Sequence, residues 1–139
     1  MSAEHLLTLC TFATFSMFGV IWIIQLIHYP AYRYIDVNEF QKYQKLHQNR
    51  ISVLVLPLML IELISSIYLF MLQFESLFYI LNLATVLLLW LLTFSIFVPL
   101  HGKLQADHSP KKITTLIRMN WVRTILWSLR ATLLLFYPL

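Results

Sequence analysis

The chain has 139 residues, a length that accommodates a single domain. Hydrophobic residues make up 60% of it and charged residues 12%, against about 45–50% and about 25% in soluble globular proteins. This composition excludes intrinsic disorder and argues against a water-soluble fold, and the single cysteine, Cys10, excludes an intramolecular disulfide. The net charge of +4 comes without the basic and aromatic pattern of nucleic-acid-binding proteins. We therefore expect a membrane protein whose partner is the lipid bilayer and which binds no nucleic acid.

Four apolar stretches are each long enough to cross a hydrocarbon core about 30 Å thick, which takes roughly 20 helical residues. They cover approximately residues 6–28, 51–72, 77–100 and 116–137. The first is too long for the apolar core of a signal peptide and no Lys or Arg precedes it, so we expect it to stay in the mature protein. Since none alternates like a barrel strand, the sequence predicts an all-α, polytopic membrane protein. It is one domain, residues 1–139, folded as an up-down four-transmembrane-helix bundle.

Local signals mark where these helices begin, bend and end. Pro30 is expected to end the first span, because the residue before a proline avoids the helical conformation. Asp36, three residues before a glutamate, is typical of a capping box and would open a helix that continues into the second span. Pro57 predicts a kink in the second span. Ser109 followed by Pro110 is typical of an N-cap with proline at the first helical position.

The Lys and Arg residues give the predicted bundle a direction. Both long connections are basic, whereas the hairpin at residues 73–76 and the two ends of the chain carry no cation. The connections hold Arg33, Lys42, Lys45, Arg50, Lys103, Lys111, Lys112 and Arg118. By the positive-inside rule we expect both connections in the cytoplasm and the N- and C-termini outside.

Three histidines from three predicted helices fall at this cytoplasmic interface. His28 closes the first span, His47 precedes the second by one turn, and His101 directly follows the third. Imidazoles that converge from several helices bind Cu, Fe or Zn, and three protein ligands leave a coordination position open for chemistry. Two of them would instead suffice to ligate haem b axially. The alternative interpretation is that the histidines are interfacial residues, with the ring among lipid headgroups and the polar tip in water.

The fourth span brings further polar groups to the same depth. Asn120, Trp121 and Arg123 lie near its cytoplasmic end, given a rise of about 1.5 Å per residue. Arg123 and Asn120 are suited to hold a developing phenolate or quinone oxygen, as an oxyanion hole does. We therefore take Asn120, Trp121 and Arg123 as candidate catalytic residues.

Two opposite charges lie deeper in the predicted spans, Glu62 in the second and Arg130 in the fourth. A lone charge near the middle of the bilayer costs at least roughly 2.5–3.5 kcal/mol, so we expect the two to form a buried ion pair. One interpretation is a structural pair that fixes helix register and rotation. The other is functional: the pair forms the floor of a cavity entered from the histidines, or the gate of a transport path.

Several short motifs are similar to those of a known group of membrane proteins. They are, in chain order, His28-Tyr29-Pro30, Pro57, Val98-Pro99-Leu100-His101, Asn120-Trp121-Val122-Arg123-Thr124 and Arg130. On these motifs the chain resembles the small four-span bacterial integral membrane proteins of the anthrone-oxygenase-like family. The resemblance implies a place in the bacterial inner (cytoplasmic) membrane and oxidation of polycyclic aromatic anthrones to quinones with dioxygen. It also implies a site that includes His28, Pro99, Trp121 and Arg123, while His101 stands where relatives often have asparagine and so adds a candidate ligand.

The expected function is that of an integral membrane oxidoreductase with a histidine-lined site on the cytoplasmic side. Its substrate would be a hydrophobic aromatic or quinone-like small molecule that enters from the bilayer, and the histidines would act as metal or haem ligands or as a general base. Two alternatives remain at this stage. One is a subunit of a small-molecule or ion transporter or channel, for which four spans would call for a homo-oligomer. The other is a membrane assembly subunit without chemistry.

Overall fold

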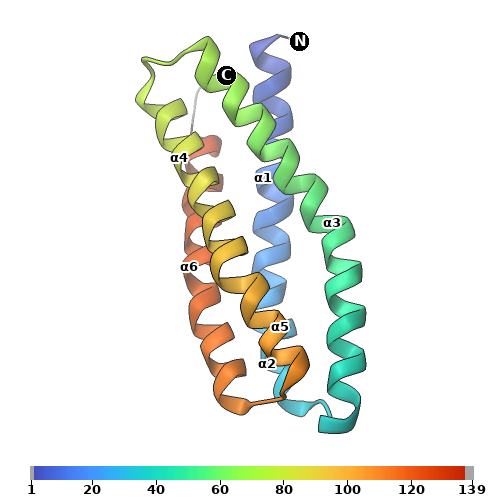
Figure 1. Cartoon of the computed structure of the whole chain (residues 1–139). Coiled ribbons are helices and arrows are strands. Elements are labelled where there is room, and N and C mark those ends of the chain that lie inside the picture. The colour runs from blue at the N-terminus through green and yellow to red at the C-terminus, as the bar shows by residue number, and fades with distance from the viewer. Residues whose placement is uncertain (1, 137–139) are drawn as a thin grey trace.

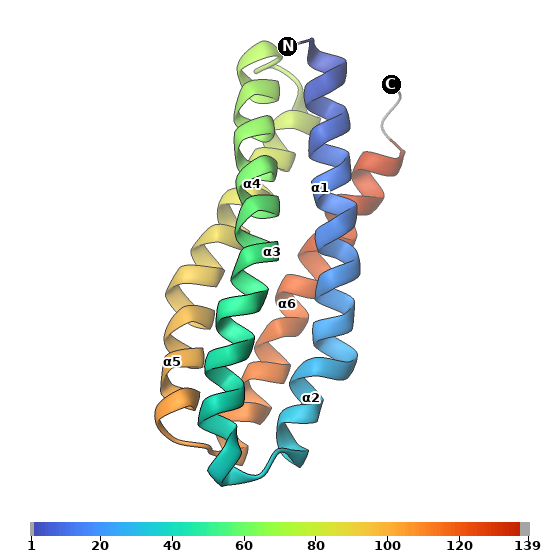
Figure 2. The ribbon, with the colours of Figure 1, turned by 90° about the vertical axis from the view of Figure 1, so that its right-hand side faces the viewer.

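The computed structural model describes residues 2–136, and within that range the chain is helical, with short turns and no strand. The helices form four elongated segments that lie side by side (Figures 1 and 2). The first segment joins α1 (Ala3–Ile23), a π-helical turn η1 (Ile24–His28), the short helix α2 (Tyr29–Ala31) and a 3-10 turn η2 (Tyr32–Tyr34). The all-α prediction is therefore confirmed.

The other three segments follow in chain order. The second is α3 (Val37–Leu72), one helix of 36 residues. The third joins α4 (Leu77–Leu92), a second π-helical turn η3 (Thr93–Phe97) and α5 (Val98–Ala106). The fourth is α6 (Pro110–Leu135). α1 packs against both α3 and α6, and α3 also packs against α4, so the four segments share one interior.

Pro30 does not end the first helical segment, which continues through α2 and η2. The reason is the π-helical turn just before it, where the N–H of Tyr29 bonds to the carbonyl of Ile24, five residues back. A π-helical turn holds one residue more than an α-helical turn, so the backbone is already widened where the proline has no N–H to donate. The same arrangement precedes Pro99, because the N–H of Val98 also bonds five residues back.

Helix starts follow the sequence signals. Asp36 caps α3, its carboxylate accepting from the N–H of Asn38 at 2.8 Å. α6 begins at Pro110 with Ser109 in the N-cap position, although the Ser109 side chain makes no capping bond. Pro57 lies inside α3, and the α3 ribbon bends along its length (Figure 1).

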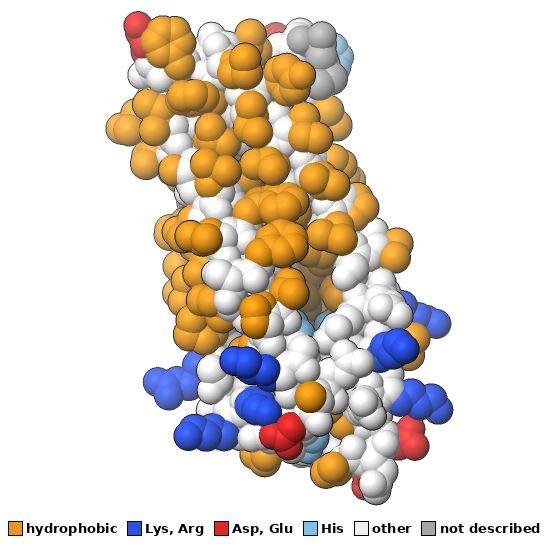
Figure 3. All heavy atoms as spheres, in the orientation of Figure 1, with side chains coloured by type: hydrophobic (Ala, Val, Ile, Leu, Met, Phe, Trp, Pro, Cys, Tyr) orange, Lys and Arg blue, Asp and Glu red, His pale blue; other side chains and the backbone are white. Residues whose placement is uncertain are grey.

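Apolar side chains cover much of the outer surface, as expected for a chain whose solvent is lipid. Figure 3 shows them over most of one face, with the Lys and Arg side chains gathered around one end of the molecule. Three helical segments are long and apolar enough to cross a membrane, Ala3–Tyr34, Val37–Leu72 and Leu77–Ala106. α6 is not among them, and the stretch predicted as the fourth span holds three arginines, Arg118, Arg123 and Arg130.

The buried apolar side chains form three clusters along the long axis. The cluster at the charged end includes Ile24 and Phe97, and the next one includes Met59 and Trp127. The third, farthest from the charged end, includes Cys10. The candidate site lies where the first two clusters meet.

Candidate functional site

A cavity of about 340 Å³ opens between α3 and the third helical segment. Its wall is mostly apolar, and its edge carries the partly exposed side chains of Leu56 on α3 and of Phe94 and Val98 on η3 and α5. Figure 3 shows a hollow in the apolar surface just beyond the Lys and Arg side chains, with histidine atoms visible in it. This volume lies in the range of small-molecule sites, and the opening faces the side that lipid would cover.

The two π-helical turns build this cavity. η1 contributes Ile24, and η3 contributes Thr93, Phe94 and Phe97 to its wall. A π-helical turn locally widens a helix and interrupts its regular packing, which is why such turns are frequent at functional sites. The prolines that follow each turn are thus part of the site's architecture.

Arg123 brings a buried cation to this apolar wall. Its side chain is 6% exposed, and its guanidinium carbon lies 4.3 Å from the ring centroid of Phe97 and 5.2 Å from that of Trp127. The Nε atom is buried, and no residue in the described part of the chain accepts a hydrogen bond from it. Residues 2–136 form two ion pairs, Lys112–Asp107 and Arg130–Glu62, and neither involves Arg123. The aromatic rings offset only part of the cost of burying this charge, because no anion neutralises it.

A chain of three polar side chains ends beside Arg123. Nε2 of the Gln44 amide lies 2.7 Å from Nδ1 of His101, and Nε2 of His101 lies 2.9 Å from the Tyr29 hydroxyl oxygen. Gln44 and Tyr29 are buried, and Tyr29 interacts with the guanidinium of Arg123. Both ring nitrogens of His101 are therefore engaged within the protein, and its partner Tyr29 lines the cavity.

His47 also lines the cavity but has a different environment. Its ring stacks on that of His28, with centroids 3.9 Å apart and planes 30° apart. His28 in turn lies 3.3 Å from the Tyr32 hydroxyl through Nε2. No hydrogen bond to the His47 ring is found among the described residues. His47 separates the cavity from a shallow groove of about 280 Å³ lined by Arg50 and Tyr43 among others.

The structure does not support the predicted three-histidine ligand set. Across residues 2–136 no group of three His, Cys, Asp or Glu side chains is placed to hold a metal ion. The lone pairs of an imidazole lie in its ring plane, so the stacked rings of His28 and His47 do not aim at one point. The nitrogens of His101 are already taken by Tyr29 and Gln44. The same stacking leaves no space for a haem between the rings of His28 and His47.

Asn120 and Trp121, the other candidates from the fourth predicted span, do not line the cavity. Asn120 is buried in a separate cluster, where its amide donates to Oε1 of Gln25 at 2.9 Å. Trp121 is 40% exposed and packs edge-to-face on Trp22, with ring centroids 5.7 Å apart. Of the three candidate catalytic residues on α6, the structure therefore brings only Arg123 to the cavity.

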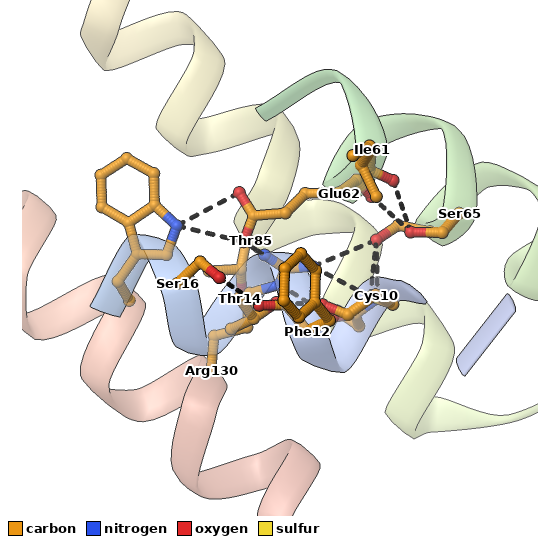
Figure 4. A network of polar contacts seen from close by, with 12 residues as sticks. Cys10, Phe12, Thr14, Ser16, Ile61, Glu62, Ser65, Thr85 and Arg130 are labelled. Carbon is orange, nitrogen blue, oxygen red and sulfur yellow. Dashed lines mark hydrogen bonds and ion pairs between the residues drawn. The ribbon is translucent and has the colours of Figure 1, made fainter. Parts of the chain in front are cut away.

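Glu62 and Arg130 form a buried ion pair deeper in the molecule (Figure 4). The indole N–H of Trp127 donates to the Glu62 carboxylate at 3.2 Å, and Nε of Arg130 donates to Oδ1 of Asn82 at 2.8 Å. Nη2 of Arg130 also lies 3.2 Å from Sγ of Cys10 on α1. This network ties four helices together. Neither charge lines the cavity, so the pair is not its floor.

Sequence reasoning missed Tyr29, Gln44 and Gln48 as site residues. Tyr29 belongs to the motif His28-Tyr29-Pro30, in which only the histidine is of a type that commonly binds metals. Gln44 and Gln48 are one helical turn apart, on either side of His47 along α3, and both carry buried amide atoms. Two glutamines at this spacing, flanking a histidine just before an apolar span, were the available signal.

Comparisons with protein-family models, with curated proteins and with solved structures gave no match for this chain. The resemblance to the anthrone-oxygenase-like family therefore stays a prediction based on the sequence motifs alone.

Proposed function

We propose that this chain is an integral membrane protein that binds a lipophilic aromatic or quinone-like molecule in the cavity and oxidises it. One observation carries the proposal: a buried guanidinium, which has no counter-ion among residues 2–136, lines a mostly apolar cavity. A ligand that brings an oxygen to Arg123 and a ring system to Phe94, Phe97 and Val55 would satisfy both features. The cavity's opening toward the lipid-facing surface supports entry of such a ligand from the bilayer.

The proposal includes four crossings of the membrane, with α6 as the fourth. Arg123 and Arg130 are buried, and burial in the interior is how charged side chains are accommodated in membrane helices. The basic end then lies in the cytoplasm and the chain termini outside, in the inner (cytoplasmic) membrane of a bacterium. The cavity opens next to the basic end, so the proposal puts its opening at the cytoplasmic side of the bilayer.

The groups around the cavity suit a proton abstraction followed by oxidation. In a substrate with a methylene group conjugated to an aryl ketone, His47 would take a proton from the methylene carbon. The electron pair left behind moves onto the ketone oxygen, giving a phenolate that Arg123 stabilises. Dioxygen is the oxidant: one of its atoms becomes the new carbonyl oxygen at the former methylene carbon, and the other leaves as water with the two hydrogens.

The test is an oxidation assay on purified protein in lipid nanodiscs, with anthrone as the probe. We expect dioxygen uptake and formation of the quinone chromophore above the rate in empty nanodiscs. Arg123→Gln should lower the rate at least about tenfold, since a charge-assisted contact to the oxyanion is lost. Arg118→Gln is the matched control, because it removes the same charge from an exposed position of the same helix. Equal rates for the two variants would overturn the role of Arg123.

A further inference from the structure

Two residues that line the cavity each carry a buried hydrogen-bond donor without a partner among residues 2–136. The two donors are Nε of Arg123 and Nε2 of Gln48, for which the described part of the chain offers no acceptor in hydrogen-bonding geometry. A buried donor without an acceptor costs free energy, so a ligand that accepts from these atoms recovers it. We therefore expect a ligand in this cavity to present a hydrogen-bond acceptor to the wall.

The chain from Gln44 to Tyr29 adds a third donor. The Gln44 amide N–H donates to Nδ1 of His101, which leaves the His101 proton on Nε2. That N–H donates to the Tyr29 oxygen, so the hydroxyl hydrogen of Tyr29 points away from His101. The guanidinium of Arg123, the other neighbour of this hydroxyl, only donates and cannot receive that hydrogen.

The orientation of the Gln44 amide decides the direction of this chain. As the structure has it, one buried acceptor, Oε1 of Gln44, is left without a partner. Within residues 2–136, either orientation leaves one N–H of Gln44 without a partner. The reversed amide would leave a second buried N–H unpaired in place of the carbonyl oxygen, and an unpaired N–H costs more than a carbonyl oxygen with a free lone pair. The amide therefore stays as it is, and His101 carries its proton on Nε2.

Resting on the proposed function, we infer that the cavity selects a ligand oxygen that is a strong hydrogen-bond acceptor and carries no hydrogen to donate. An ionised phenol or enol, or a quinone carbonyl, has such an oxygen, whereas a methyl ether carries no charge and is a poor acceptor. Arg123, Gln48 and Tyr29 are the donors that meet the oxygen. Gln44 is a positioning residue, which acts through His101 on the direction of the Tyr29 hydroxyl.

The binding test uses a matched pair of probes in zwitterionic lipid nanodiscs, with empty nanodiscs subtracted. The first is 2,4-dinitro-1-naphthol, which is ionised at neutral pH, and the second is its methyl ether. We expect equilibrium dialysis to show that the protein binds the naphtholate at least about tenfold tighter than the ether. Tyr29→Phe should reduce that preference severalfold. Gln44→Met should reduce the preference as well. In the double variant with Tyr29→Phe, Gln44→Met should cause no further reduction, because Gln44 acts through the Tyr29 hydroxyl.

The positioning role of Gln44 is tested separately, by determining with ¹⁵N NMR which ring nitrogen of His101 carries the proton. The wild-type protein should carry the proton on Nε2, and Gln44→Glu should move it to Nδ1, because a carboxylate accepts where the amide donates. A structural role of Gln44 alone would not reverse the tautomer.

The outcomes separate the two proposals. If both probes bind with equal affinity, the cavity takes lipophilic molecules but does not select an acceptor oxygen, and the inference is overturned while the proposed site survives. A Gln44→Met effect that persists in the Tyr29→Phe background, or a wild-type His101 protonated on Nδ1, overturns the positioning role. If neither probe binds above empty nanodiscs, the proposed function itself fails.

Discussion

Arg123 and Arg130 are two turns apart on α6 and both buried, yet their surroundings differ. Arg130 is paired with Glu62 and donates to Asn82, Cys10 and Ser66. Arg123 has aromatic rings and a phenol around it but no carboxylate. A residue that costs stability and is not compensated within the fold is typical of a functional position.

We therefore expect Arg123→Met to stabilise the protein in the absence of ligand. Removing an unpaired buried charge removes its desolvation cost but also the cation–π contacts. We expect a net increase of about 1–3 kcal/mol in the free energy of unfolding. The measurement is the free energy of unfolding in detergent. Arg130→Met is the matched control and has the opposite sign: it leaves Glu62 buried and unpaired, at a cost of about 3–5 kcal/mol. An Arg123→Met variant as unstable as Arg130→Met would mean that Arg123 has an internal structural role.

At the scale of elements, the π-helical turns η1 and η3 are the features that make a cavity in a small helical protein. Each holds one residue more than an α-helical turn and lies directly before a helix that contains a proline. Without η3, the side chains of Phe94 and Phe97 would continue an ordinary helix face. The shape of the cavity wall therefore depends on the backbone geometry of these turns as well as on the side chains that line it.

Removal of Ser95 tests this role of η3. Ser95 is an exposed residue within the turn and does not line the cavity. Taking out one residue lets the turn close as an α-helical turn while the helices on either side keep their phase. We expect the variant to keep its far-ultraviolet circular dichroism but to bind the dinitronaphtholate at least about tenfold more weakly, since Phe97 no longer supports Arg123. Unchanged binding would show that η3 is dispensable for the site.

The sequence was sufficient to predict the helices but only part of the site. Long apolar runs predict helices because the bilayer leaves no other way to satisfy the backbone, and Asp36 and Pro110 mark helix starts through local chemistry. The effect of Pro30 was predicted wrongly, because the rule that a helix ends before a proline assumes a regular α-helical turn, whereas a π-helical turn precedes Pro30. Ring orientation is equally non-local: the sequence placed His28, His47 and His101 at one depth, but not the stacking that separates their lone pairs.

At the scale of the whole molecule, charge and polarity are arranged along the long axis. The Lys and Arg side chains gather at one end, and the cavity opens next to them (Figure 3). The Glu62–Arg130 network (Figure 4) lies in the interior about two helical turns beyond Arg123 along α6. Each group of charges thus has different surroundings: the cations at the end are on the surface, Arg123 has aromatic rings and a phenol around it, and Arg130 has a carboxylate. The side of the membrane on which the basic end lies therefore decides at which side of the bilayer the cavity opens.

The orientation can be measured with single cysteines at the two ends of the molecule. Glu75 lies in the acidic hairpin between α3 and α4, and Lys45 lies near the basic end of α3; both side chains are exposed. The natural cysteine, Cys10, is buried with no exposed surface, so it should give little background labelling.

In intact bacterial cells, we expect a membrane-impermeant maleimide to label Glu75→Cys but to label Lys45→Cys only after permeabilisation, because the positive-inside rule predicts that Lys45 lies in the cytoplasm. The reverse pattern would place the cavity at the outer side of the bilayer. The proposed function would then require a substrate that arrives from outside the cell.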